Sequence, residues 1–178
     1  IKKNINKNLL KDSKTISTKE RKQLANYIKK NSIYSINKAS IKEIDKLNIL
    51  QATLLSMKRA INNLKHKPNI IFIDGTHAPK NTSYHFKTII RGDEKIPAIS
   101  AASIIAKVAR DRYITRLAKK YISYGWHTNF GYGTKKHLNA INKFGVTIHH
   151  RKSFRPMHNI LLSKKNNHNL TKLFSIVS

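Results

Sequence analysis

Hydrophobic residues recur at helical spacing in four stretches of this chain. The stretches cover residues 18–30, residues 48–65, the segment from Pro97 to about Tyr121, and the segment from Thr134 to Gly145. Ser-x-x-Glu pairs of capping-box spacing, which favour helix starts, begin at Ser17 and Ser40. In the third stretch we predict that one stripe packs closely because most of its members are small: Ile99, Ala102, Ala106, Ala109, Tyr113 and Leu117.

Three shorter apolar runs have the length of β-strands. They are residues 32–37, 69–73 and 87–90. The run at 69–73 is continuous, which is typical of a strand buried on both faces. Helices that alternate with strands predict an α/β fold in which helices cover a sheet.

Charge is the unusual feature of the composition. The 178 residues include 36 Lys and Arg but only eight Asp and Glu, so the formal net charge is +28. Such an excess favours a polyanionic partner, with nucleic acid ahead of an anionic membrane surface. The alternative is compositional drift toward lysine. The absence of cysteine excludes disulfides, thiolate zinc sites and cysteine nucleophiles, and no apolar run is long enough to span a bilayer.

Two of the eight acids occupy positions that are informative. Asp74 follows the apolar run 69–73, and ligands of α/β sheets bind at the carboxyl ends of strands. Asp93 lies in a Gly-flanked turn before the long helix. Each has a purely structural interpretation, Asp74 in an Asp-Gly turn and Asp93 at a helix start. As a pair on adjacent strand ends they suit hard cations, Mg²⁺ or Mn²⁺, which hydrolyse phosphodiesters.

Six motifs then follow one another in the order found in bacterial ribonuclease HII, which this chain resembles from about residue 8 to 157. They are DSKTIS (12–17), EIDKLNILQATLLSMKRAI (43–61), IFIDG (71–75), RGDEKIPAISAASIIAKVARDR (91–112), YGWHTNFGYGTKKHL (124–138) and HHRKSFRP (149–156). The resemblance implies a ribonuclease H-like mixed sheet flanked by helices, with a C-terminal helical portion. It also implies a ribonuclease HII-like domain at 1–157 and a basic tail at 158–178.

The resemblance further implies an activity and its site residues. The family cuts the RNA strand of RNA–DNA hybrids and incises at ribonucleotides embedded in DNA, leaving 5′-phosphate and 3′-hydroxyl ends. It uses two divalent cations, Mn²⁺ or Mg²⁺, held by four carboxylates. Asp74 and Asp93 match two of these. Tyr132 matches a tyrosine that packs on the sugar at the ribonucleotide junction, and Lys14 a lysine near the substrate backbone. Without the resemblance, the favoured interpretation of Tyr132 is a loop aromatic that packs on its own glycines.

One part of the family pattern is missing. An Asp-Glu followed by Gly-Arg-Gly, which supplies the other two carboxylates and contacts the ribose 2′-hydroxyl, does not occur in the 178 residues. The first residue is not methionine, so we expect an N-terminally truncated sequence that lacks the first strands. The alternative is a degenerate, catalytically inactive protein that still binds nucleic acid.

The remaining expectations concern the substrate and the setting. Lys107, Arg110 and Arg151 are candidates to line the duplex backbone, although each alone has the alternative of a solvated surface charge. We expect an RNA–DNA hybrid, or a DNA duplex that contains ribonucleotides, as the partner. We also expect a cytoplasmic monomer with no membrane partner.

Overall fold

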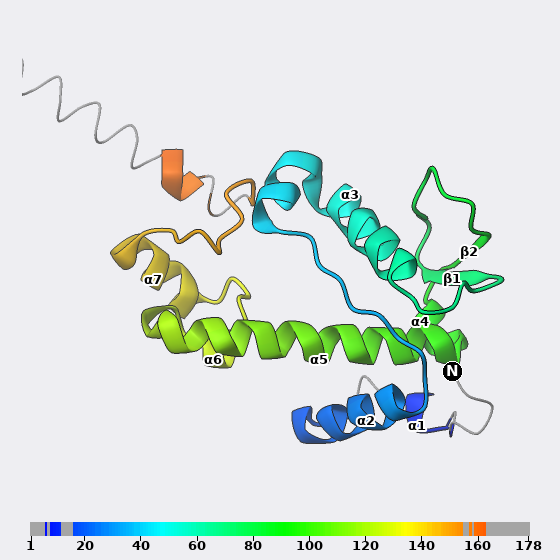
Figure 1. Cartoon of the computed structure of the whole chain (residues 1–178). Helices are drawn as coiled ribbons and strands as arrows, with labels where there is room; N and C mark the ends of the chain where they lie inside the picture. Colours follow the sequence, from blue (N-terminus) through cyan, green and yellow to red (C-terminus); the bar gives the residue numbers. More distant parts are fainter. Residues whose placement is uncertain (1–5, 7, 12–15, 155–156, 158, 163–178) are drawn as a thin grey trace, which may run out of the picture. The chain divides into compact units, whose positions relative to one another are not determined.

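The computed structural model describes residues 6, 8–11, 16–154, 157 and 159–162 (Figure 1). In chain order its elements are α1 (Asn8–Lys11), α2 (Thr18–Lys30), α3 (Ile41–Asn62), β1 (Ile71–Asp74), β2 (Phe86–Ile89), α4 (Gly92–Lys95), α5 (Pro97–Lys120), the 3-10 helix η1 (Ile122–Tyr124), α6 (Trp126–Asn129) and α7 (Lys135–Phe144). This order confirms the predicted α/β class, with helices in the majority.

The described residues divide into two units. Unit 1 takes those up to Lys38 together with 53–113, and unit 2 takes 39–52 together with those from Ile114 onward. The long helices α3 and α5 contribute residues to both units. No helix in the described part of the chain is both long and apolar enough to cross a membrane.

The core of unit 1 is aliphatic and lies between α2 and the first part of α5. Its buried members are Leu10, Ala25, Ile28, Ala101, Ile104, Ile105 and Val108. Helix α2 begins as predicted, because the Ser17 side chain and the Glu20 side chain satisfy each other's backbone N–H groups. The predicted stripe on α5 is wrong in part. Ala102, Ala106 and Tyr113 are exposed, because the face at 101, 104, 105 and 108 is the one that packs on α2.

The sheet of unit 1 consists, in the described residues, of β1 and β2 in parallel, with Ile71 opposite Phe86 and Asp74 opposite Ile89. The predicted strands at 69–73 and 87–90 are therefore present with shifted ends. Burial of the first strand on both faces is wrong: only Ile73 is buried, and Ile70 is 47% exposed. A two-stranded sheet offers too little neighbouring structure to cover both faces.

The strand predicted at 32–37 is also wrong. Its residues have no strand assignment, and Ile33, Tyr34 and Ile36 are all exposed. A strand requires a neighbour that accepts and donates backbone hydrogen bonds, and this segment has no such neighbour among the described residues.

Helix α3 begins at Ile41, before the predicted 48–65 stretch, ends at Asn62 and is broken at Asn48. Residues 41–47 form a first helical segment, capped by Ser40 and Glu43 as the spacing predicts. At Asn48 the backbone turns to φ 69°, and its Oδ1 accepts a hydrogen bond from the Gln51 N–H, which starts the second segment.

The core of unit 2 is aromatic. Tyr124 and Trp126 stack at 5.4 Å between ring centroids, above the buried Ile141 of α7. Helix α7 has the predicted cap at Thr134 and ends at Gly145, which has φ 83°. The amphipathic pattern of the sequence therefore places this helix correctly.

Candidate functional site

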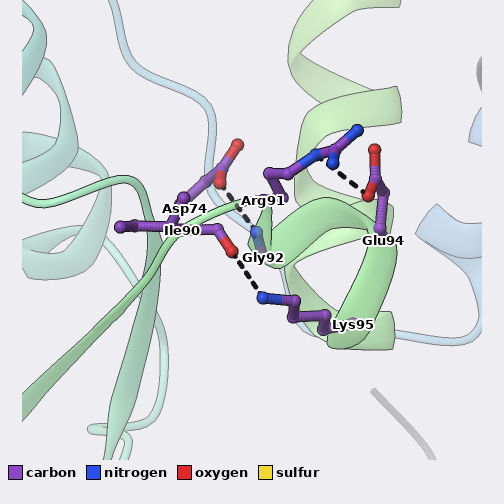
Figure 2. A network of polar contacts seen from close by, with 6 residues as sticks. All are labelled: Asp74, Ile90, Arg91, Gly92, Glu94 and Lys95. Carbon is purple, nitrogen blue, oxygen red and sulfur yellow. Dashed lines mark hydrogen bonds and ion pairs between the residues drawn. The ribbon is translucent and has the colours of Figure 1, made fainter.

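The predicted site begins at the carboxyl end of β1. Asp74 is exposed there, and its Oδ1 accepts a hydrogen bond from the Gly92 N–H at 2.8 Å, as Figure 2 shows. The neighbouring Gly75 N–H donates to the Ile89 carbonyl at 2.9 Å, which continues the ladder by one step. The ends of the two parallel strands therefore hold the Asp74 carboxylate against the start of α4.

The turn between β2 and α4 is fixed by side chains that also appear in Figure 2. Lys95 Nζ donates to the Ile90 carbonyl at 3.0 Å, and Arg91 Nε lies 3.3 Å from Glu94 Oε2. Arg91 adopts the left-handed conformation at φ 55° and ψ 44°, which is uncommon for a residue with a Cβ.

The space at Gly92 is too small for a side chain unless Ile99 shifts. A Cβ on it would lie 2.5 Å from Ile99 Cδ1, 3.4 Å from Ile89 Cβ and 3.6 Å from the Asp74 Cα. The close contact is therefore with the Ile99 side chain of α5, whereas the distance to the Asp74 backbone is an ordinary van der Waals contact.

Asp93 is the residue after Gly92 and is half-buried in α4. Its backbone thus lies beside Asp74, as a shared site would require. The two aspartates fit a hard divalent cation in kind, because carboxylate oxygens are its preferred ligands. In number they are only part of a site. Within the described residues, no group of three or more His, Cys, Asp or Glu side chains is placed to hold a metal ion.

Tyr132 lies in unit 2, on the loop between α6 and α7, and its side chain is 57% exposed. The buried Asn129 builds this loop: its Nδ2 donates to the Tyr124 carbonyl and its Oδ1 accepts from the Gly131 N–H. This exposure leaves Tyr132 accessible to a ligand.

The predicted basic contacts are distributed over both units. Lys107 is exposed on α5, and Arg110 has its Nη1 3.6 Å from Asp111 Oδ1, so an acid partly neutralises it. Arg151 belongs to unit 2 and stacks over the Phe154 ring at 4.8 Å. Lys14 lies outside the described residues.

Two contacts, one at the site and one in unit 2, could not be predicted from the sequence. One is the Gly92 amide that binds Asp74, which requires knowledge of how the strand ends meet. The other is in unit 2, where Asp45 binds the segment at Lys152 and Ser153, more than a hundred residues away in the chain. Contacts at that separation do not follow from local periodicity.

Known proteins that resemble this chain identify its family. The family model for ribonuclease HII matches residues 2–158. A ribonuclease HII of Pelagibacter ubique is 56% identical over 157 residues, covering 88% of this chain and 84% of the relative. One of Roseobacter denitrificans is 41% identical, covering 88% and 79%.

A solved structure shares the fold at lower sequence similarity. The ribonuclease H2 of Pyrococcus horikoshii superimposes with a TM-score of 0.69 at 24% identity, covering 85% of this chain and 79% of that one. The chain therefore belongs to the ribonuclease HII family, divalent-metal-dependent endonucleases that act on nucleic acid and cleave the RNA of RNA–DNA hybrids.

Proposed function

We propose that this protein cleaves the RNA strand of RNA–DNA hybrids, and also incises at ribonucleotides embedded in DNA, with Asp74 and Asp93 as two of the ligands of two divalent cations, Mg²⁺ or Mn²⁺. The observation that carries the proposal is the hydrogen bond of 2.8 Å from Gly92 N–H to Asp74 Oδ1. This bond orients the Asp74 carboxylate and holds the backbone of Gly92, the neighbour of Asp93, beside it. Bound cations of this type activate water and neutralise charge on the leaving oxygen.

Each aspartate has a separate part in this arrangement. Asp74 has one oxygen oriented by the Gly92 amide. Its Oδ2 has no hydrogen-bond partner among the described residues, which suits it to a cation. Asp93 is supplied from α4, so the two ligands come from two elements that meet at one turn.

The proposed hydrolysis forms one bond to phosphorus and breaks one. A water oxygen forms a new bond to phosphorus, the bond from phosphorus to the 3′ oxygen breaks, and that oxygen takes up a proton. The products are a 3′-hydroxyl and a 5′-phosphate. RNA is distinguished from DNA by its 2′-hydroxyl, and the exposed ring of Tyr132 offers a surface for the neighbouring sugar.

The basic residues have a supporting role in the proposal. Lys14, Lys107, Arg110 and Arg151 contact the phosphate backbone, which gives affinity that falls steeply with salt. We further propose that the protein acts in the cytoplasm as a monomer and has no membrane partner.

Nicking of a duplex with one embedded ribonucleotide tests the proposal. We expect Asp74→Asn to abolish nicking in Mg²⁺ and in Mn²⁺ while the protein stays folded, because asparagine keeps an oxygen for the Gly92 N–H but loses the charge that binds a cation. Glu20→Gln, a helix-cap acid changed to its amide, is the matched control and should nick normally. Nicking by Asp74→Asn at the unaltered rate would refute the metal role of Asp74.

A second candidate function is binding of the hybrid without cleavage. The sequence favours it in one respect, because no Asp-Glu followed by Gly-Arg-Gly is present in the 178 residues. The same assay separates the two functions. Salt-sensitive binding of the hybrid with no product at any Mn²⁺ concentration would support the second and exclude the first for these 178 residues.

A further inference from the structure

Asp45 of unit 2 accepts three hydrogen bonds from the segment at Lys152 and Ser153. Its Oδ1 accepts from the Ser153 N–H at 3.0 Å and from the Ser153 hydroxyl at 2.6 Å, and its Oδ2 accepts from the Lys152 N–H at 3.2 Å. Both carboxylate oxygens are therefore occupied. An acid that is one of only eight in a protein of net charge +28 is used here to hold a basic segment.

The pKa of Asp45 agrees with this use. Burial acts to raise the pKa of its carboxyl, but the hydrogen bonds from Ser153 and Lys152 outweigh burial, so the pKa is lowered. Asp45 is consequently ionised throughout the neutral range, and its charge is engaged by backbone and hydroxyl donors.

The same segment is anchored at its other end by His150. This residue is 6% exposed, its Nδ1 accepts a hydrogen bond from the Thr147 N–H at 2.9 Å, and its ring stacks at 5.3 Å on His137. The chain between His150 and Ser153 is thus fixed on both sides. Arg151 lies between these two anchors.

Arg151 lines an open groove of about 410 Å³ on unit 2, whose other wall is the chain around the break at Asn48. Its guanidinium lies over Phe154, 4.8 Å from the ring centroid, and Lys46 lines the groove as a second cation. A planar guanidinium stacked on a ring loses little freedom on binding, and its fork of donors fits a phosphate.

We propose that this groove binds a backbone phosphate of the nucleic acid through Arg151 and Lys46, and that Asp45 is the positioning residue that holds Arg151 there. Charge complementarity selects the occupant: two cations line the groove, and its one acid is saturated by hydrogen bonds. This inference rests on the proposed function only in that the ligand is the same nucleic acid. The charge of Asp45 alone would repel the nucleic acid, but by positioning Arg151 this residue strengthens binding.

The experiment measures the affinity of an RNA–DNA hybrid in EDTA, so that no cleavage occurs, over a series of salt concentrations. Loss of one phosphate contact by Arg151→Gln should weaken binding roughly threefold and reduce the slope of log affinity against log salt by about 1. Asp45→Ala should weaken binding in the same direction. The double variant should bind no more weakly than Arg151→Gln alone, because Asp45 acts through Arg151.

Glu20→Gln is the matched control, since it also removes one negative charge from the protein. Simple electrostatics predicts that losing an acid from so basic a protein tightens binding to a polyanion. Weakening by Asp45→Ala with slight tightening by Glu20→Gln supports the proposal. Tightening by both variants, or an additive double variant, overturns the positioning role.

Two further outcomes complete the test. Ser153→Ala removes only the 2.6 Å hydroxyl contact and should weaken binding less, so it replaces Asp45→Ala if that variant does not fold. An unaltered affinity and salt slope in Arg151→Gln overturn the phosphate site itself. Nicking by the unaltered protein is scored separately, so binding without cleavage refutes the proposed function and leaves this inference standing.

Discussion

The two units of this protein stabilise their cores with different chemistry. The buried members of the core of unit 1 are all aliphatic and come from α1, α2 and α5, with Tyr27 packed against them at the edge. The core of unit 2 is built around Tyr124 and Trp126, with His137 and His150 packed against them. Apolar burial does not depend on pH, whereas burial of imidazole does. Acid should therefore affect unit 2 and have little direct effect on the core of unit 1.

The units also differ in how each uses an aspartate. Asp74 in unit 1 accepts one hydrogen bond, from a backbone N–H, and Asp45 in unit 2 accepts three, two from backbone N–H groups and one from a hydroxyl. A carboxylate that is saturated by the protein's own donors is suited to hold structure. One that is only partly satisfied and exposed can bind an external cation. The comparison thus distinguishes Asp45, whose carboxylate is filled by the protein's own donors, from Asp74, whose carboxylate keeps an oxygen for the proposed cation.

The largest expected effect concerns His150 and acid. Burial, together with the neighbouring His137, lowers the pKa of His150 to about 4. Its folded-state pKa is below the ordinary value of 6.5, so the stabilisation is complete above pH 6.5 and is lost as pH falls toward 4. The difference in pKa corresponds to about 3 kcal/mol.

Urea unfolding at pH 7, 5.5 and 4.5 measures this loss. The single tryptophan, Trp126, is buried 5.3 Å from the His150 ring and reports on unit 2 through its fluorescence. His150→Phe should flatten the pH dependence, and His127→Gln, at an exposed histidine, should leave it unchanged. Equal pH dependence in all three proteins would contradict the prediction.

A smaller effect is expected at the turn of unit 1. Gly92→Ala introduces a Cβ at 2.5 Å from Ile99 Cδ1, so the buried end of the Ile99 side chain must shift, which should cost about 1–2 kcal/mol of unfolding free energy. Because Ile99→Val removes that terminal carbon, the alanine should cost clearly less in the valine background. Chemical denaturation of the two single variants and the double variant gives the coupling, and strict additivity would exclude the steric explanation.

The smallest effect compares the helix caps of the two units. Ser17→Ala removes the side-chain cap of α2 in unit 1, and Thr134→Ala removes that of α7 in unit 2. Each should cost about 1 kcal/mol. If the units unfold separately, the unfolding transition followed by Trp126 fluorescence should shift in Thr134→Ala and not in Ser17→Ala. Equal shifts in both variants would show that the units unfold as one.

The sequence predicts the helices better than the strands, and the reason is local. The ends of α2 and α7 are encoded within four residues by Ser17 and Thr134, so sequence alone places them. Strands depend on distant partners, which is why the predicted strand at 32–37 does not form. The buried face of α5 was assigned wrongly in part, because a helix rich in alanine offers more than one apolar stripe and the position of α2 selects between them.

The site shows the same division between local and distant information. The positions of Asp74 and Asp93 at the ends of predicted strands follow from local pattern, and the structure places Gly92, the neighbour of Asp93, on Asp74. The metal role of both aspartates stays a prediction. The contact of Asp45 with Ser153 spans 108 residues and has no local signature, so only the folded chain reveals it.

The left-handed Arg91 restricts which mutations evolution can retain at this turn. A β-branched residue at position 91 would clash with its own backbone. Glycine would remove the backbone strain but would also remove the ion pair with Glu94. Substitutions at positions 91 and 94 are therefore expected to be correlated among homologous sequences, with glycine at 91 accompanied by loss of the acid at 94.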